Sequence, residues 1–285
     1  MKDLRFRYFI GFLLLALALG TSACFVFPNS YSAVPPGPWR GILKLEFNPV
    51  APNPRGEPLP EKVDMQFAEV TEGQLPFNFS ITYVSGDSLR LTLQNAQQAI
   101  VVDDIIYGRN RATGDDTIRF YFPQGETYLR GKYAGGIIEG EWVETQSPDN
   151  RIPFVAYHGK DHRFTVLNKT PAGDLTGNWT VTLGLNADST YTGVASFTQT
   201  GNQLTGRLET DRQTFDHLEG TVQENKLYLS YFDGQRAILI EGKIMENRQL
   251  IGSLRAGMNE RIIWEAVRDT DGERTPASPT RDTEN

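Results

Sequence analysis

The amino-acid sequence predicts an all-β, antiparallel protein made of two duplicated eight-stranded meander units. Apolar and polar residues alternate in short runs, and Gly, Asn, Asp or Pro interrupts these runs about every 8–12 residues. Two blocks of about a hundred residues also share motifs in the same order, which indicates an internal repeat. We expect each unit to close as a lipocalin-like barrel, or the two to form one large curved sheet.

The two blocks begin alike, with "GPWRGILKLEF" and "GNWTVTLGL". In each, a Trp begins an apolar strand face, because side chains two positions apart lie on the same side of a strand. These faces are Trp39, Leu43, Leu45 and Phe47 in the first block and Trp179, Val181, Leu183 and Leu185 in the second. The Gly-x-Trp triplet is also seen in lipocalin-like barrels, and we expect Trp179 to be a barrel plug.

Two further matches follow in the same order. Residues 79–93 align with 197–208 around a turn glycine, and residues 117–132 align with 226–243 around another, each of the latter ending in Gly-Lys. Trp142 and Trp264 lie near the ends of the two blocks, so that a pair of tryptophans brackets each block. The turn at Gly125 should correspond to the turn at Gly234.

Eight strands are expected in each unit. In the first they start near Trp39, Phe77, Leu89, Ile100, Ile118, Thr127, Ile137 and Ile152. In the second they start near Trp179, Thr192, Leu204, His217, Leu227, Arg236, Leu250 and Ile262.

The N-terminus carries a positive segment and an apolar run over residues 9–20, which is typical of a secretory signal peptide. Small residues then precede Cys24, the single cysteine of the chain. This pattern resembles the lipobox of bacterial lipoproteins, although Thr21 stands where Leu is usual. The resemblance implies that Cys24 is lipidated and tethers the protein to a membrane. Plain cleavage after Ala23 and a retained apolar anchor are the alternatives.

The expected domain organisation follows from these features. It comprises a lipoprotein signal peptide over 1–23, a proline-containing tether over 24–36, a first β unit over 37–165, a second β unit over 170–269 and a disordered polar tail over 270–285.

Composition excludes several classes of function. The chain has net charge −7 and the leader +2, so the part from Cys24 onward carries −9, which argues against nucleic-acid binding. One cysteine allows no internal disulfide, no Cys-x-x-Cys pair and no cysteine zinc site. With three histidines in 285 residues, we expect no metal and no cofactor.

The second block and parts of the first resemble the β-rich N-terminal region of exported thioredoxin-like (TlpA-type) lipoproteins of Bacteroidetes. The matching segments are "F.Q.G..LTG" at 197–206, "L.G.....KL.LS.FDG" at 218–234, "W.A.RD" at 264–269, and "LPF" (75–77), "G.W" (140–142) and "PF.A..G...RF" (153–164) in the first block. The resemblance covers nearly all of residues 37–269. It implies an envelope location and a β architecture, but no residues here match the family's redox pair.

Four candidate chemical groups point to no enzyme. They are His158 with His162, the pairs Asp103–Asp104 and Asp115–Asp116, Ser230, and the loop 108–116. The histidines are interpreted as exposed turn residues without a third metal ligand. Neighbouring carboxylates on a strand point to opposite faces and suit no acid–base pair. Ser230 lacks the context of a nucleophile elbow, and no helix follows the loop to bind a phosphate.

The sequence therefore predicts a non-catalytic lipoprotein of the bacterial cell envelope, held by its lipid on the periplasmic side or outer membrane. Its β module would contact a protein partner, for example a separately encoded thioredoxin-like protein. The alternative is a lipocalin-like carrier of a small apolar or amphiphilic ligand. Inward side chains would line its cavity or fill the core: Trp179, Phe197, Leu204, Leu227 and Leu229.

Overall fold

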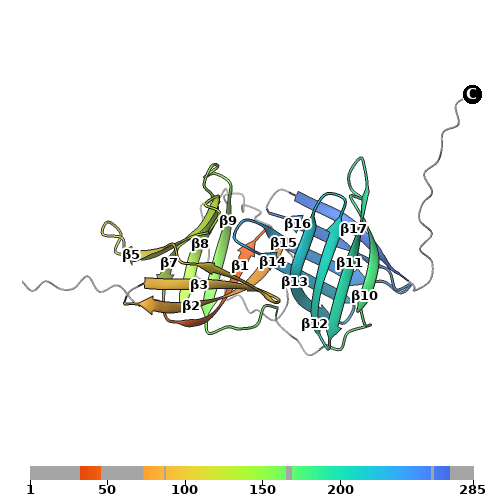
Figure 1. The fold of residues 1–285 in the computed structure, drawn as a ribbon, viewed down its shortest axis with the longest axis horizontal. Helices are drawn as coiled ribbons and strands as arrows, with labels where there is room; N and C mark the ends of the chain where they lie inside the picture. Colours follow the sequence, from red (N-terminus) through yellow and green to blue (C-terminus); the bar gives the residue numbers. More distant parts are fainter. Residues whose placement is uncertain (1–32, 46–72, 87, 165–168, 258–259, 270–285) are drawn as a thin grey trace, which may run out of the picture. The chain divides into compact units, whose positions relative to one another are not determined.

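A computed structural model describes residues 33–45, 73–86, 88–164, 169–257 and 260–269 (Figure 1). These residues form seventeen strands and no helix, and neighbouring strands pair antiparallel, which confirms the predicted fold class. Cys24, the signal peptide, most of the tether, Phe47 and the C-terminal tail lie outside the described residues. In the part that is described, no helix is long and apolar enough to cross a membrane.

The first unit is a nine-stranded sheet with the order β4-β3-β2-β1-β9-β8-β7-β6-β5. Its strands are β1 (Gly37–Lys44), β2 (Gln74–Ser85), β3 (Ser88–Asn95), β4 (Gln98–Val102), β5 (Ile105–Arg109), β6 (Asp116–Tyr121), β7 (Thr127–Ala134), β8 (Ile137–Glu144) and β9 (Arg151–His158). Strands β4 and β5 end the order and are not bonded to each other, so this unit is barrel-like but not closed.

The second unit is a closed barrel of eight strands, with β10 bonded to both β11 and β17. Its strands are β10 (Gly177–Leu183), β11 (Tyr191–Thr200), β12 (Gln203–Thr210), β13 (Thr214–Gln223), β14 (Lys226–Phe232), β15 (Ala237–Ile244), β16 (Leu250–Ala256) and β17 (Glu260–Arg268). All eight strands expected from the sequence are present.

The ninth strand of the first unit corrects the prediction of eight. Strand β4 pairs only with β3, and β5 pairs only with β6, with Asp103 and Asp104 between them. In the barrel, the corresponding β13 pairs with β12 and with β14 and overlaps both neighbours at Glu219, Gly220 and Thr221. The first unit therefore has the same topology with its fourth strand split, and it lacks the overlap that closes the second.

The starts of the two units match in backbone and side-chain detail. Gly37 and Gly177 have φ angles of +119° and +122°, a region that favours glycine. Two residues later, Trp39 and Trp179 are 0 % and 2 % exposed. Each indole Nε1 donates to the carbonyl oxygen four residues earlier, at 3.2 Å and 2.9 Å. These agreements support the predicted duplication.

The tryptophans near the ends of the two blocks, Trp142 and Trp264, are not structurally equivalent. Facing glycines set the register: Gly131 pairs with Gly140 in the first unit, as Gly242 pairs with Gly252 in the second. Counting from these pairs places Trp142 on β8 opposite Leu129, whereas Trp264 lies on the last strand, β17. Both mark the end of a block in the sequence, but they occupy different strands of the repeat.

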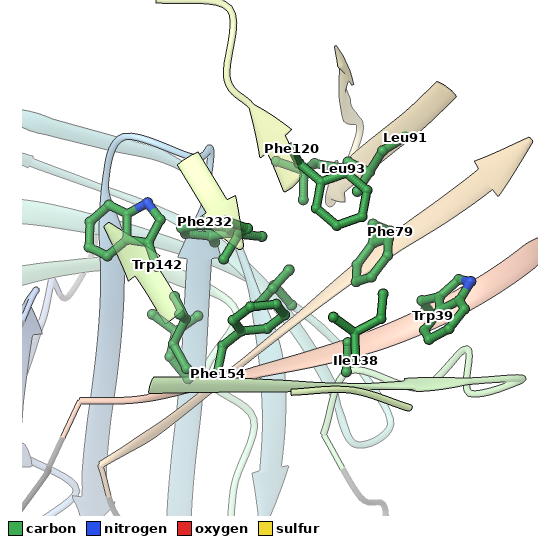
Figure 2. Close-up of a cluster of buried hydrophobic side chains, with 14 of the residues drawn as sticks. Trp39, Phe79, Leu91, Leu93, Phe120, Ile138, Trp142, Phe154 and Phe232 are labelled. Atoms are coloured by element: carbon green, nitrogen blue, oxygen red, sulfur yellow. The ribbon is translucent and has the colours of Figure 1, made fainter. Parts of the chain in front are cut away.

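Two hydrophobic clusters form the core. One lies wholly within the barrel. The other fills the first unit and includes four residues from β14 and β15 of the barrel: Tyr228, Phe232, Ala237 and Leu239. Figure 2 shows Phe232 in this cluster next to Trp142. Residues 33–36 were expected to belong to the tether, but they pack on the first unit. Val34 is fully buried, and its carbonyl accepts a hydrogen bond from the Tyr83 hydroxyl.

Candidate functional site

The barrel interior is filled by its own side chains. The five inward residues predicted from the sequence all lie in the barrel core and are at most 7 % exposed. The Cζ atom of Arg268 lies 5.1 Å from the centre of the Trp179 ring and covers it. Leu185, expected on the same face as Trp179, lies beyond the end of β10 and is 41 % exposed. Trp179 is thus buried in the way expected of a plug.

The two histidines have different surroundings. His158 ends strand β9, its ring centre lies 5.1 Å from that of Trp39, and its Nε2 is 3.0 Å from the Pro36 carbonyl. It is therefore a packing residue, not the exposed turn residue that we expected. His162 is exposed, and desolvation followed by the charges of Arg40 and Lys160 lowers its pKa. Among the described residues, no cluster of His, Cys, Asp or Glu could hold a metal ion.

Cations neutralise three of the four paired aspartates. Asp103 binds Arg90 at 2.6 Å, Asp115 binds Lys132 at 2.7 Å, and Asp116 binds Arg109 at 2.8 Å. The hydrogen bond from Arg90 lowers the pKa of Asp103, and the one from Lys132 lowers that of Asp115. A general acid needs the opposite, a raised pKa. These three carboxylates are therefore held in ion pairs, with Asp116 paired across β5 and β6.

Ser230 is fully buried on β14. Its Oγ donates to the Pro76 carbonyl at 2.7 Å and accepts from the Arg163 guanidinium at 3.1 Å. A hydroxyl held in this way is not available as a nucleophile, because its proton and its lone pair are both engaged away from solvent. It links the barrel to the first unit instead.

Arg163 is the centre of the contact between the two units. Its guanidinium donates to the carbonyls of Gln94 and Ser230 and to the side chain of Asn95, and its Nε lies 3.4 Å from the carboxylate of Glu219. Burial lowers the pKa of Arg163 to about 10, while the Glu219 charge acts in the opposite direction. Arg163 thus remains a buried cation at neutral pH and joins β3, β13 and β14.

The outward side of β5–β8 carries a hollow of about 660 Å³. It is lined by Ile106, Asn110, Thr117, Ile118, Arg119, Arg130, Gly131, Lys132, Glu139, Gly140 and Glu141. Ile106 at its edge is 59 % exposed. Arg130 is paired with Glu141 at 2.7 Å. The hollow combines exposed aliphatic surface with charged groups of both signs.

Two tyrosines and an arginine adjoin this hollow. The rings of Tyr121 on β6 and Tyr128 on β7 have centres 5.4 Å apart. The Cζ atom of Arg119 lies 6.0 Å and 5.6 Å from the two ring centres, and its Nη1 donates to the Tyr121 hydroxyl at 3.0 Å. Among the described residues, Arg119 has no carboxylate partner. We call these three residues the Tyr-Arg cluster.

Two smaller hollows lie on the outward side of the barrel. One, of about 230 Å³, is lined by residues of β14–β17 around the Gly242–Gly252 pair and so corresponds to the hollow of the first unit. The other, of about 310 Å³, is polar and is lined by β11–β13 with Ala96 and Gln97. None of these three hollows is lined by the five inward residues of the barrel.

Sequence reasoning missed the residues that join the units. Asn95 lies outside any motif, and Arg163 lies within the segment 153–164 but was assigned no role. Arg163 contacts Ser230 and Asn95, which are 67 and 68 residues away in the chain, and Asn95 contacts Phe232, which is 137 residues away. One signal was present: the run "KLYLSYF" in β14 has almost no polar alternation, and six of its seven residues are buried. A nearly continuous apolar run of this kind is typical of a strand that is buried on both faces. The Tyr-Arg cluster was also missed, because its residues come from two strands.

Comparisons with known proteins identify no family for this chain. No family model matches it, and no curated protein matches it. Among solved structures, it is similar to a protein of unknown function of the DUF3598 family from Nostoc punctiforme, with 10 % sequence identity over 82 % of this chain and 94 % of that chain. The TM-score of 0.27 is too low for this likeness to support a conclusion about fold or function.

Proposed function

We propose that this protein is a non-catalytic lipoprotein module of the bacterial cell envelope, anchored through Cys24, whose outward β5–β8 face binds a protein partner. The observation that carries the proposal is the Tyr-Arg cluster beside the 660 Å³ hollow. Tyrosine and arginine are among the residue types enriched at the energetic centres of protein interfaces. The filled barrel interior is a second support, because it favours surface contact over ligand storage.

The chemistry of the face indicates what the partner presents. Arg119 is an exposed cation that packs on two tyrosines and has no ion-pair partner among the described residues, and Lys132 and Arg130 lie on the adjacent strand. An acidic side chain on the partner would complete a charge-assisted pair there. The exposed Ile106 would pack against an apolar residue of the partner. A separately encoded thioredoxin-like protein is the partner that the sequence resemblance suggests.

Cross-linking in intact envelopes tests the proposal. The wild-type chain should give one discrete cross-linked species, and Arg119→Glu should reduce it at least tenfold, because a buried charge reversal costs several kcal/mol. Lys160→Glu is the matched control, since it makes the same charge change at an exposed residue outside this face. Equal cross-linking of wild type and Arg119→Glu would contradict the proposed surface.

The anchor needs a separate test. Cys24→Ser should move the protein to the soluble fraction or leave the leader uncleaved, because the lipid can no longer be attached. If this variant fractionates and migrates like wild type, the anchor is wrong even if the partner surface is right.

The alternative proposal is a carrier of a small apolar or amphiphilic ligand. It requires a cavity of at least ~300 Å³ lined mainly by apolar side chains. The inward residues named above are buried against one another, which weighs against it. Native mass spectrometry of the purified protein decides between the two, since a stoichiometric small ligand would favour the carrier and a bound polypeptide the partner module.

A further inference from the structure

One end of the first unit encloses a turn of the barrel. The turn includes Phe232, the last residue of β14, and the two residues that follow it toward β15, Asp233 and Gly234. The Phe232 ring lies in an aromatic cage, with ring centres at 4.6 Å for Phe77, 5.6 Å for Phe122 and 5.7 Å for Trp142. Phe232 is fully buried there (Figure 2).

Polar groups of the first unit bind the backbone of this turn. The Asn95 side chain donates from Nδ2 to the Phe232 carbonyl at 2.8 Å and accepts the Phe232 N–H on Oδ1 at 3.2 Å. The Gly234 carbonyl accepts from Trp142 Nε1 at 2.7 Å and from Thr127 Oγ1. Asn95 is 0 % and Thr127 3 % exposed, so these groups are built into the interior. Because these hydrogen bonds go to the backbone of Phe232 and of Gly234, they depend on the backbone conformation of the turn at both positions.

The third position of the turn accepts only glycine. Gly234 has φ +93°, and a Cβ there would overlap the Phe122 ring. The equivalent turn glycine of the first unit, Gly125, also has a positive φ of +72°, but no atom lies within 4 Å of its Cβ position. Glycine is therefore required at position 234 for two reasons: the positive φ angle and the contact that a Cβ atom would make with the Phe122 ring.

We propose that this end of the first unit is a recognition site for a polypeptide turn of the form aromatic-x-glycine, and that the chain's own turn occupies it as an internal plug. Phe77, Phe122 and Trp142 select the aromatic ring, Asn95 binds its backbone, and Trp142 with Thr127 binds the glycine carbonyl. A turn of the same form on another polypeptide fits the site when the plug is displaced. This site is separate from the β5–β8 face and goes beyond the proposed function.

Displacing the plug in the full-length chain tests the proposal. Gly234→Ala should undock the turn, whereas Gly125→Ala introduces the same strain without the clash. We expect Gly234→Ala to lower the melting temperature by on the order of 10 °C and Gly125→Ala by a few degrees. The probe is a dye-labelled cyclic peptide carrying YFDGQR, the sequence of residues 231–236.

The expected result is peptide binding to Gly234→Ala and at least tenfold weaker binding to wild type and to Gly125→Ala. Adding Asn95→Ala to the undocked variant should abolish binding. Absence of binding to an undocked Gly234→Ala chain would overturn the proposal, and so would equal melting temperatures for the two glycine variants.

A second variant covers the case in which Gly234→Ala fails to fold. Phe232→Ala leaves the turn in place and empties the aromatic cage, and apolar cavities of this kind bind small aromatic molecules. Toluene should raise the melting temperature of Phe232→Ala by several degrees and leave wild type unchanged. If toluene has no effect on Phe232→Ala, the cage does not select an aromatic ring and the proposal fails.

Discussion

The hairpins β6–β7 and β14–β15 occupy the same position in the two units but have opposite surroundings. When the two hairpins are aligned by their strand pairing, the outward positions of the first are Thr117, Arg119, Tyr121, Tyr128 and Arg130. The equivalent positions of the second are, in the same order, Lys226, Tyr228, Ser230, Leu239 and Glu241. The first set is exposed or half-buried, whereas four of the second set are at most 9 % exposed. Inward residues are apolar in both. The outward residues alone therefore decide whether a hairpin of this repeat forms a surface or an internal interface.

Burial of the second hairpin imposes a requirement that the first does not have. A buried polar group without a hydrogen bond costs about 1–3 kcal/mol. Ser230 meets this requirement through Pro76 and Arg163, and Glu241 through the Gly73 N–H at 3.1 Å and Arg255. In the exposed hairpin, water can serve Arg119 and Arg130.

The largest expected effect tests whether the two units are stabilised in the same way. Trp39→Ala and Trp179→Ala should each lower the free energy of unfolding by ~3–5 kcal/mol, because each removes a buried indole and leaves a cavity. Chemical denaturation of both variants measures this. An unchanged stability for either variant would show that its Trp is not a plug.

Arg163 tests the interface between the units. Arg163→Met should cost about 3 kcal/mol, because it leaves buried acceptors on Gln94, Asn95 and Ser230 without a donor. Arg130→Met removes an ion pair on the exposed hairpin and should cost at most ~1 kcal/mol. Thermal melts of the two variants compare them directly, and equal costs would mean that Arg163 does not hold the units together.

Reciprocal substitutions at equivalent positions sharpen the comparison. Leu239→Tyr puts a larger side chain into a packed site and should cost ~1–3 kcal/mol, whereas Tyr128→Leu on the exposed hairpin should change stability by ~0.5 kcal/mol or less. Denaturant midpoints measure both. Similar costs in the two directions would contradict the conclusion that only one hairpin is an interface.

The smallest effect concerns the split strand of the first unit. The hydrogen bond from Arg90 lowers the pKa of Asp103 in the folded state below its ordinary value of 3.8, so this pair stabilises the fold above that pH and the effect is lost as pH falls through the lowered pKa. Asp103→Asn should therefore melt slightly below wild type at pH 7, with the difference shrinking below pH ~4. Asp188→Asn, at an exposed residue without an ion pair among the described residues, is the control for the change of charge at pH 7.

Local pattern was enough to place most strands. Alternating apolar residues bounded by turn residues located all eight strands of the barrel, and the two Gly-x-Trp triplets located the start of each unit. The missed strand, β5 (Ile105–Arg109), follows β4 (Gln98–Val102) with only Asp103 and Asp104 between them, and apolar residues lie on both sides of these two aspartates. Whether such a run is one strand or two depends on which neighbours each half bonds, and these neighbours are distant in the chain.

The candidate sites were less accessible to sequence reasoning than the fold. Asp103 and Asp115 lie in ion pairs, His158 was not recognised as a packing residue, and the sequence did not indicate the contacts of Asn95 and Arg163. The Tyr-Arg cluster and the turn-binding cage each combine residues from at least two strands. Spacing along one strand cannot reveal such groups.

The sequence by itself determined the all-β class, the repeat, the strand periodicity and the N-terminal pattern around Cys24, because each depends on residues close together in the chain. Only the tertiary structure decided which unit closes, which hairpin is buried and which side chains surround Phe232. Closure depends on the overlap of three residues in β13 that β4 and β5 lack. Burial of Phe232 depends on Phe77 and Trp142, which are far away in the sequence and reach it only when both units have folded.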